Sequence, residues 1–111
     1  MESDKYQELC RETAVYPDAT MSQALSYLAL GINGEAGEVA EKVKKIIRDK
    51  SGNVSLKDEV EIAMEVGDLL WYCAELLSRL KYKMSETMDL NVDKLQSRLK
   101  RGKLHGSGDE R

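Results

Sequence analysis

An all-α fold built around two long antiparallel helices is predicted for this chain of 111 residues. Apolar residues recur at alternating steps of three and four along most of the chain, which is the spacing of one face of an amphipathic helix. One proline and no phenylalanine fit a helical protein and give no support to a β fold. A chain of this length forms one domain with a limited core. We therefore expect a four-helix-bundle-type core that is completed by oligomerisation.

The first two helices are predicted from their boundaries. Residues 3–14 have the pattern of a short amphipathic helix, and Pro17 lies just beyond it. The residue before a proline avoids helical geometry, so the helix ends there. Thr20 and Gln23 have the Thr-x-x-Gln spacing of a capping box, which opens a second helix. The apolar stripe of this helix predicts that it runs to about Lys50.

Two further helices follow a polar loop at residues 51–53. Ser55 is a suitable N-cap for the third helix, which we expect to run to about Lys83. Ser85 is expected to cap a fourth helix over residues 86–101. Residues 1–101 would then form a single all-α domain. The remaining segment, residues 102–111, is rich in Gly and Ser and is expected to be a mobile C-terminal tail.

The composition argues against several classes of protein. The formal charge of −3 gives no reason to expect nucleic acid as a partner, and the basic stretch at 94–103 lacks aromatic residues for stacking on bases. Cys10 and Cys73 lie in helical patterns and fit buried thiols in a reducing compartment. There is no basic-then-apolar leader and no long uncharged apolar run. We therefore expect a soluble, cytoplasmic protein without a membrane partner.

Two acidic clusters stand out within the long helices. The first contains Glu35 and Glu38, and the second contains Glu65 and Asp68, so each pair is three residues apart and lies on one side of a helix. Glu35 falls within the apolar stripe, where a glutamate is rare unless it is paired or holds a metal. Four converging carboxylates repel one another, and a hard divalent cation removes that cost. All-oxygen ligands favour Mg²⁺, with Mn²⁺ as a possible substitute.

The two clusters together resemble the Glu-x-x-Glu and Glu-x-x-Asp pattern of MazG-type all-α nucleoside triphosphate pyrophosphohydrolases. The resemblance extends through residues 27–31 and 67–72 and from Lys94 to Asp109, which is nearly the whole chain. Either cluster alone could be a pair of solvated carboxylates, because such pairs occur by chance on many helices. The resemblance implies that a nucleoside triphosphate, in particular a deoxynucleotide, is hydrolysed to its monophosphate and pyrophosphate. It also implies a role in cleansing the nucleotide pool.

The chemistry of such a site defines further candidates. A water activated by the metal would attack, with Glu35 or Glu38 as general base, and the residues leave both alternatives open. The single histidine, His105, lies in the tail and is a poor candidate for a base in the core. Cations and polar groups near the phosphates or the base form the candidate substrate-binding set, namely Lys45, Tyr72, Asn91, Lys94, Arg98 and Arg101. A solvated basic face and an interfacial tyrosine are the alternatives for these residues.

The third helix also predicts a partner. Met64 and Trp71 project from a side other than its main apolar stripe, which indicates contact with a second copy in a homodimer or homotetramer. A di-iron or di-manganese carboxylate bundle would need Glu-x-x-His pairs, and the helices contain no histidine. The remaining alternative is a non-catalytic helical oligomer that serves as a binding or adaptor protein. That alternative leaves the inward position of Glu35 unexplained.

Overall fold

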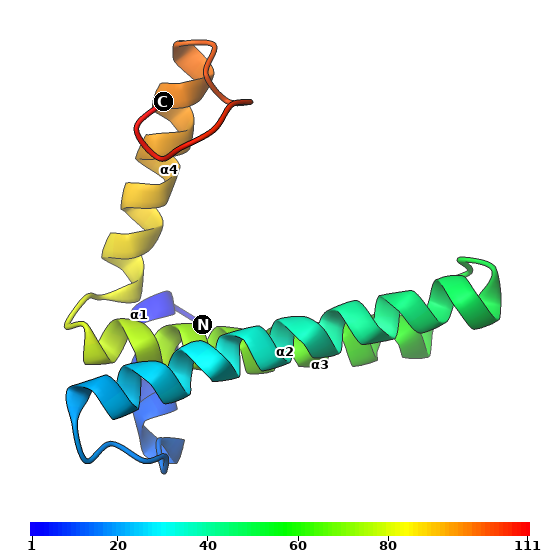
Figure 1. Cartoon of the computed structure of the whole chain (residues 1–111), viewed down its shortest axis with the longest axis horizontal. Coiled ribbons are helices and arrows are strands. Elements are labelled where there is room, and N and C mark those ends of the chain that lie inside the picture. Colours follow the sequence, from blue (N-terminus) through cyan, green and yellow to red (C-terminus); the bar gives the residue numbers. More distant parts are fainter.

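The computed structural model describes residues 1–111 and contains only helices, which confirms the all-α fold class. The elements are α1 (Ser3–Cys10), the 3₁₀ turn η1 (Arg11–Thr13), α2 (Met21–Lys50), α3 (Leu56–Arg79) and α4 (Met84–Lys100). Helices α2 and α3 form a long antiparallel hairpin, and α1 packs against α3 near the open end of that hairpin (Figure 1). Helix α4 contacts α1 and projects away from the hairpin. None of the helices combines the length and the apolar character needed to cross a membrane.

The starts of α2 and α3 confirm the predicted caps. The Thr20 side chain accepts a hydrogen bond from the backbone N–H of Gln23 at 3.1 Å. At α3, Ser55 Oγ accepts from Asp58 N at 3.1 Å, while Asp58 Oδ2 accepts from Ser55 N at 3.0 Å. These bonds satisfy backbone donors that have no partner inside the helix.

The end of α3 differs from the prediction, because the helix stops at Arg79 and not near Lys83. Lys81 adopts a left-handed conformation with φ of 65°. The N–H of Tyr82 then donates to the carbonyl of Leu77 at 3.0 Å, which closes a Schellman motif. A lysine in place of the usual glycine gives this stop no clear signal in the sequence.

The start of α4 also corrects the prediction. Ser85 lies inside the helix, and its cap is supplied by α1. Asp4 accepts from the backbone N of Ser85 at 2.9 Å and from its Oγ at 2.7 Å. Gln7 Oε1 accepts from Met84 N at 2.7 Å. Helix α4 is therefore oriented by its attachment to α1.

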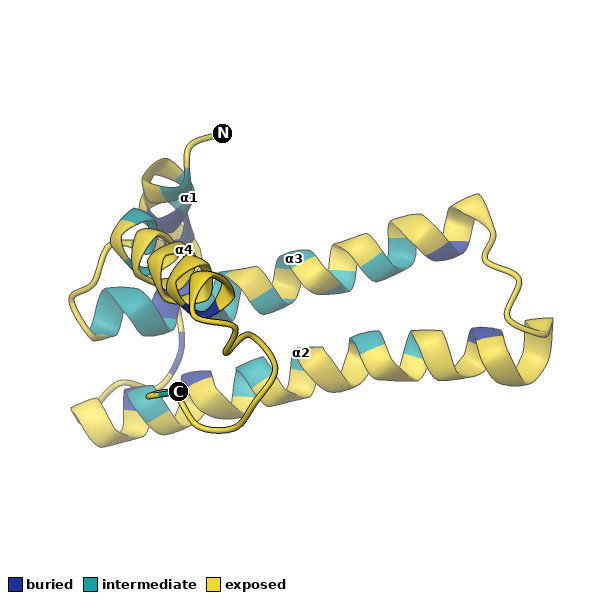
Figure 2. Ribbon diagram, turned by 90° about the horizontal axis from the view of Figure 1, so that it is seen from above, coloured by how far each residue is buried: buried dark blue, intermediate teal, exposed yellow.

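The core lies where α2, α3 and the N-terminal segment meet. Tyr16, Ala24 and Leu28 are buried there, with Trp71 and Leu76 packed against them. Only 10 of 111 residues are buried, and Figure 2 shows that exposed residues cover most of the hairpin and α4. A single copy thus leaves most of its helical surface in contact with solvent.

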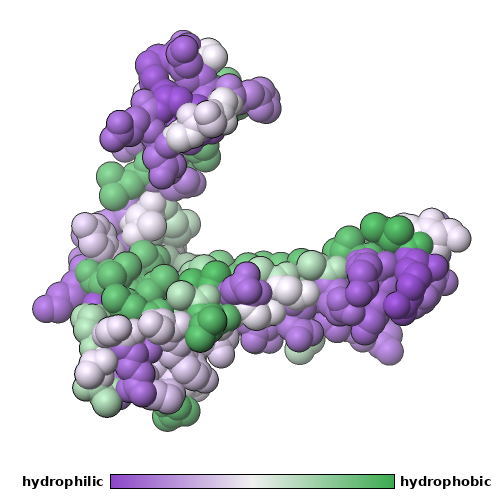
Figure 3. Space-filling view, viewed as in Figure 1, coloured by the Kyte–Doolittle hydropathy of each residue, from purple (hydrophilic) through white to green (hydrophobic).

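Large apolar side chains remain on that surface. Val54, Leu56 and Val60 are exposed by 53%, 80% and 59%. Figure 3 shows apolar surface at the closed end of the hairpin, where the chain turns from α2 to α3. Contiguous apolar surface of this kind marks an interaction site more often than a free face. The fold therefore has surface available for a further chain.

One glycine of α2 is required by packing. A Cβ at Gly31 would overlap the ring of Tyr72 from α3, whereas a Cβ at Gly37 would meet nothing within 4 Å. We expect Gly31→Ala to lower the free energy of unfolding by about 1–3 kcal/mol through overpacking. Gly37→Ala is the matched control and should raise it by up to about 1 kcal/mol through helix propensity. Urea denaturation measures both, and equal effects would show that Tyr72 does not need the space.

The closed end of the hairpin is held by an ion pair. Lys50 Nζ lies 2.8 Å from both carboxylate oxygens of Asp58, and with Ser55 it lowers the pKa of Asp58 from 3.8 to about 2. A lowered folded-state pKa contributes stability that is present above pH 3.8 and lost as the pH falls toward 2. We expect Asp58→Asn to be less stable at neutral pH and to lose less stability over this acid range.

Chemical denaturation at a series of pH values measures this difference. Glu59→Gln is the control, because Glu59 is a neighbouring exposed carboxylate that makes no ion pair. The same acid dependence in wild type and Asp58→Asn would contradict the role of the Lys50 pair.

Candidate metal centre

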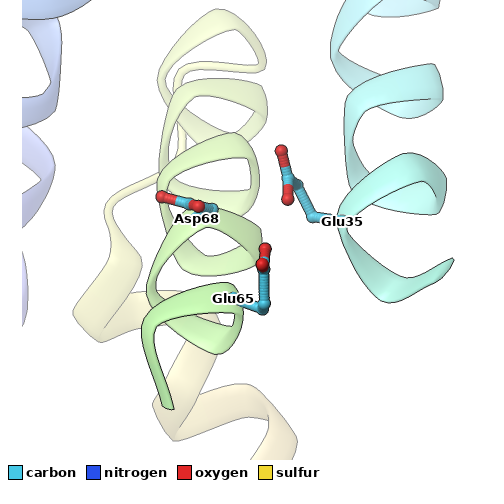
Figure 4. Close-up of side chains that lie close together, drawn as sticks. All are labelled: Glu35, Glu65 and Asp68. Atoms are coloured by element: carbon cyan, nitrogen blue, oxygen red, sulfur yellow. The ribbon is translucent and has the colours of Figure 1, made fainter. Parts of the chain in front are cut away.

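Three carboxylates meet between α2 and α3. Glu35 comes from α2, Glu65 and Asp68 come from α3, and one oxygen of each lies within 4.8 Å of the others. Figure 4 shows Glu35 and Glu65 between the two helices, with Asp68 beside them on α3 and its carboxylate directed away from α2. The arrangement follows from the inward position of Glu35 and from the one-turn spacing of the two residues on α3. Three of the four carboxylates that the sequence singles out are therefore brought together.

The charges of this group oppose one another. Burial raises the pKa of Glu35, and the negative charges of Asp68, Glu65 and Glu38 raise it further. A divalent cation relieves such repulsion, and carboxylate oxygens are the ligands that Mg²⁺ and Mn²⁺ prefer. The residues present therefore fit a hard cation. Glu38 is exposed and lies outside the group of three, so its role as a ligand stays a prediction.

Lys42 contacts this group and was missed by the sequence analysis. Its Nζ lies 3.7 Å from Glu65 Oε1 and 3.8 Å from Glu61 Oε2. Lys42 follows Glu35 by two helical turns, so both side chains face α3. The helical spacing gives no separate signal for Lys42, because its apolar neighbour Val43 also fits the steps of the apolar stripe. In the structure, Val43 is 41% exposed.

A polar cleft lies between Lys42 and the closed end of the hairpin. Its volume is about 300 Å³, and both Lys42 and Lys45 line it between α2 and α3. Lys45, one of the predicted substrate contacts, thus shares this cleft with Lys42, which contacts Glu65. Its contact with substrate stays a prediction.

Tyr72 lies on the other side of the acidic group. Its ring packs against Gly31, and burial together with nearby Tyr27 and Glu35 raises its pKa. Trp71 also packs within its own chain and is only partly buried, so its predicted contact with a second subunit stays a prediction. The Trp71 Nε1–H donates to Thr13 Oγ1 at 2.8 Å.

The remaining predicted substrate residues lie on α4. Asn91 and Lys94 line a shallow cleft of about 430 Å³, and Arg98 and Arg101 follow toward the end of the helix. Because α4 projects away from the hairpin, a single chain does not bring these residues to the three carboxylates (Figure 1). Arg98 and Arg101 instead contact the C-terminal segment of their own chain.

Comparison with known families covers the elements that carry these residues. The family model of the MazG nucleotide pyrophosphohydrolase domain matches residues 23–102. The chain belongs to this family. The match includes both acidic clusters and the basic part of α4, and MazG proteins generally depend on a divalent metal. The three converging carboxylates give this MazG chain a suitable place for one.

A relative of the MazG chain extends over its whole length. The Gene 37 protein of Mycobacterium phage L5 is 44% identical over 114 aligned residues, which cover 100% of both chains. No solved structure matches the chain. The family assignment therefore comes from the domain match, and the geometry comes from the structure described above.

Proposed function

We propose that this MazG protein is a magnesium-dependent nucleoside triphosphate pyrophosphohydrolase. It would convert a nucleoside or deoxynucleoside triphosphate and water into the monophosphate and pyrophosphate, and so cleanse the nucleotide pool of the cytoplasm. The convergence of Glu35, Glu65 and Asp68 within the family-matched region carries the proposal. A non-catalytic adaptor would have no use for three carboxylates held together against their mutual repulsion.

The acidic residues of the candidate site have proposed roles as metal ligands and general base. Glu35, Glu65 and Asp68 would hold Mg²⁺, or Mn²⁺ in its place, with Glu38 as the fourth predicted ligand. A bound Mg²⁺ supplies neutralisation of phosphate charge and activation of water. Glu35 is one candidate for general base, because it lies among the three converging carboxylates. Exposed Glu38 remains the alternative.

Completion of the site requires a second copy. The phosphate-binding candidates Asn91, Lys94, Arg98 and Arg101 lie on a helix that stands apart from the carboxylates of its own chain. In a homodimer or homotetramer, α4 of one copy would reach the hairpin of another. The thin core and the exposed apolar side chains support this assembly. We propose no nucleic acid or membrane as partner.

Product analysis tests the proposed reaction. A panel of nucleoside and deoxynucleoside triphosphates is incubated with Mg²⁺, and pyrophosphate is resolved from orthophosphate. We expect pyrophosphate and monophosphate in equal amounts, lost on addition of EDTA. Orthophosphate as the product, or no turnover of any member of the panel, would contradict the proposal. Near wild-type turnover by Glu38→Ala would remove Glu38 alone from the ligands.

Lys42 gives a separate prediction about the metal. Its ammonium group lies close enough to Glu65 to compete with a bound cation, since unit charges 4 Å apart interact by about 1–4 kcal/mol near a protein surface. We expect Lys42→Met to bind Mn²⁺ about threefold to tenfold more tightly and to be less stable without metal.

Calorimetric titration with Mn²⁺ and thermal unfolding in EDTA measure these effects. Lys45→Met is the matched control, because Lys45 lines the same cleft and makes no ion pair with the carboxylates. Unchanged or weaker Mn²⁺ binding by Lys42→Met would show that Lys42 does not compete with the metal.

A further inference from the structure

The C-terminal segment returns along α4. Gly102, with φ of 66°, ends the helix, and Lys103 N donates to the carbonyl of Arg98 at 2.7 Å. A second reversal follows at Gly108, with φ of 82°, and brings Asp109 beside the helix. Figure 1 shows this segment lying against the far end of α4. Glycine favours both reversals, because it adopts these conformations without the steric cost that other residues bear.

This segment contacts the three cations at the end of α4 that belong to the predicted substrate-binding set. Lys94 Nζ and Arg98 Nη2 each lie 3.6 Å from Asp109 Oδ1. Arg98 Nη2 also donates to the carbonyl of Asp109 at 2.9 Å, and Arg101 Nη2 donates to the main-chain oxygen of Arg111 at 2.8 Å. A carboxylate and main-chain oxygens, which accept hydrogen bonds as phosphate oxygens do, therefore contact these three cations.

The fit of the segment to Arg98 is incomplete. The Arg98 side chain is 5% exposed, yet its Nε is buried without a hydrogen-bond partner. A buried donor without an acceptor is costly. The Asp109 side chain is 89% exposed, and ion pairs of exposed groups contribute little. A phosphate group can accept from Nε and Nη2 of one arginine together, so it suits Arg98 better than the segment does.

We propose that residues 104–111 are a displaceable occupant of a phosphate-binding site formed by Lys94, Arg98 and Arg101, with Asp109 in the place of a phosphate group. The inference rests on the proposed function, which requires phosphate on this face of α4. The triphosphate must displace the segment before it binds. Its apparent affinity is therefore reduced by the fraction of chains in which the segment has left the site. Residues 104–111 thus lower the affinity of the site for triphosphate and are released when it binds.

Binding of inorganic pyrophosphate in the presence of Mg²⁺ tests the competition. The full chain is compared with a chain that ends at Lys103, which keeps the bond to Arg98 that closes the helix. We expect the shortened chain to bind pyrophosphate about threefold to tenfold more tightly and its KM for triphosphate to fall by a similar factor at unchanged kcat.

Point variants keep the test independent of the truncation. Asp109→Asn should bind pyrophosphate more tightly than wild type. Glu110→Gln removes the same charge from a residue without contact to α4 and should match wild type. Equal or weaker binding by both the shortened chain and Asp109→Asn would overturn the inference. A gain from truncation that persists in Arg98→Met would also overturn it, because the anion would then bind elsewhere.

Proteolysis separates this inference from the proposed reaction. Trypsin cleavage after Lys103 releases residues 104–111, which mass spectrometry detects. We expect pyrophosphate with Mg²⁺ to accelerate this release in the full chain and to have no such effect in Arg98→Met. Unchanged release would overturn the inference even in an active enzyme. Absence of triphosphate turnover alongside accelerated release would overturn the proposed function alone.

Discussion

Replacing Asp68 with asparagine is expected to lower turnover by about 10²–10³-fold while making the metal-free protein more stable. Asp68 contributes one oxygen to the group of three carboxylates, and its charge helps to raise the pKa of Glu35. Asparagine has nearly the same shape as aspartate but removes a carboxylate ligand of the metal. It also relieves part of the repulsion among the three carboxylates. The relief should amount to about 1 kcal/mol, because Asp68 is exposed to a medium of high dielectric constant.

The opposite signs of the two effects make the test informative. Pyrophosphate release at saturating Mg²⁺ measures turnover, and thermal unfolding in EDTA measures stability. A variant that merely misfolded would lose both. Glu59→Gln, a carboxylate on the same helix outside the group, should leave turnover unchanged. Turnover near wild type in Asp68→Asn would show that Asp68 holds no essential metal.

Local signals account for the parts of the fold that sequence could predict. Thr20 and Ser55 cap their helices through neighbours three residues away, so short stretches of sequence predict the starts of α2 and α3. The start of α4 depends on Asp4, which lies 81 positions from Ser85 along the chain. A cap supplied from another helix leaves no local pattern. The same limit applies to α3, where Lys81 takes a conformation that its residue type does not favour.

The candidate site divides in the same way. Glu35 was recognisable because a carboxylate interrupted an apolar stripe, and Glu65 and Asp68 because they lie one turn apart. Lys42 was missed because hydrophobicity predicts that Val43 faces the neighbouring helix and Lys42 faces solvent. The structure shows a half-buried Lys42 beside Glu65 and an exposed Val43. The coverage of Arg98 by Asp109 depends on two chain reversals, which composition does not specify. Periodicity identifies a face of a helix, and tertiary contacts decide what that face meets.

A buried carboxylate links the N-terminal segment to the hairpin. The Glu75 side chain has no exposed surface, and its Oε1 accepts from Arg11 Nη1 at 2.7 Å and from the Tyr16 hydroxyl at 2.8 Å. Its Oε2 is buried without a hydrogen-bond partner. The segment held in this way includes α1, whose Asp4 and Gln7 cap α4. Glu75 therefore supports the position of α4 as well as the core.

We expect Glu75→Ala to lower the free energy of unfolding by about 2–4 kcal/mol, because it removes a buried acceptor from two donors and leaves a cavity. The lower part of this range is favoured, since the Arg11 side chain is 46% exposed and water can solvate it after the change. Faster amide exchange should appear in α1 and α4 before it appears in the closed end of the hairpin, because the lost contacts hold the N-terminal segment.

Glu75→Gln is the matched variant. It keeps a side-chain oxygen that accepts from Arg11 and Tyr16, so it should cost less than half as much as alanine if the hydrogen bonds dominate. Urea denaturation gives the free energies, and hydrogen exchange locates the loosened helices. Equal losses in both variants would assign the stabilisation to the negative charge. A uniform increase of exchange over the whole chain would show that Glu75 supports the core alone, and that the position of α4 is determined by Asp4 and Gln7.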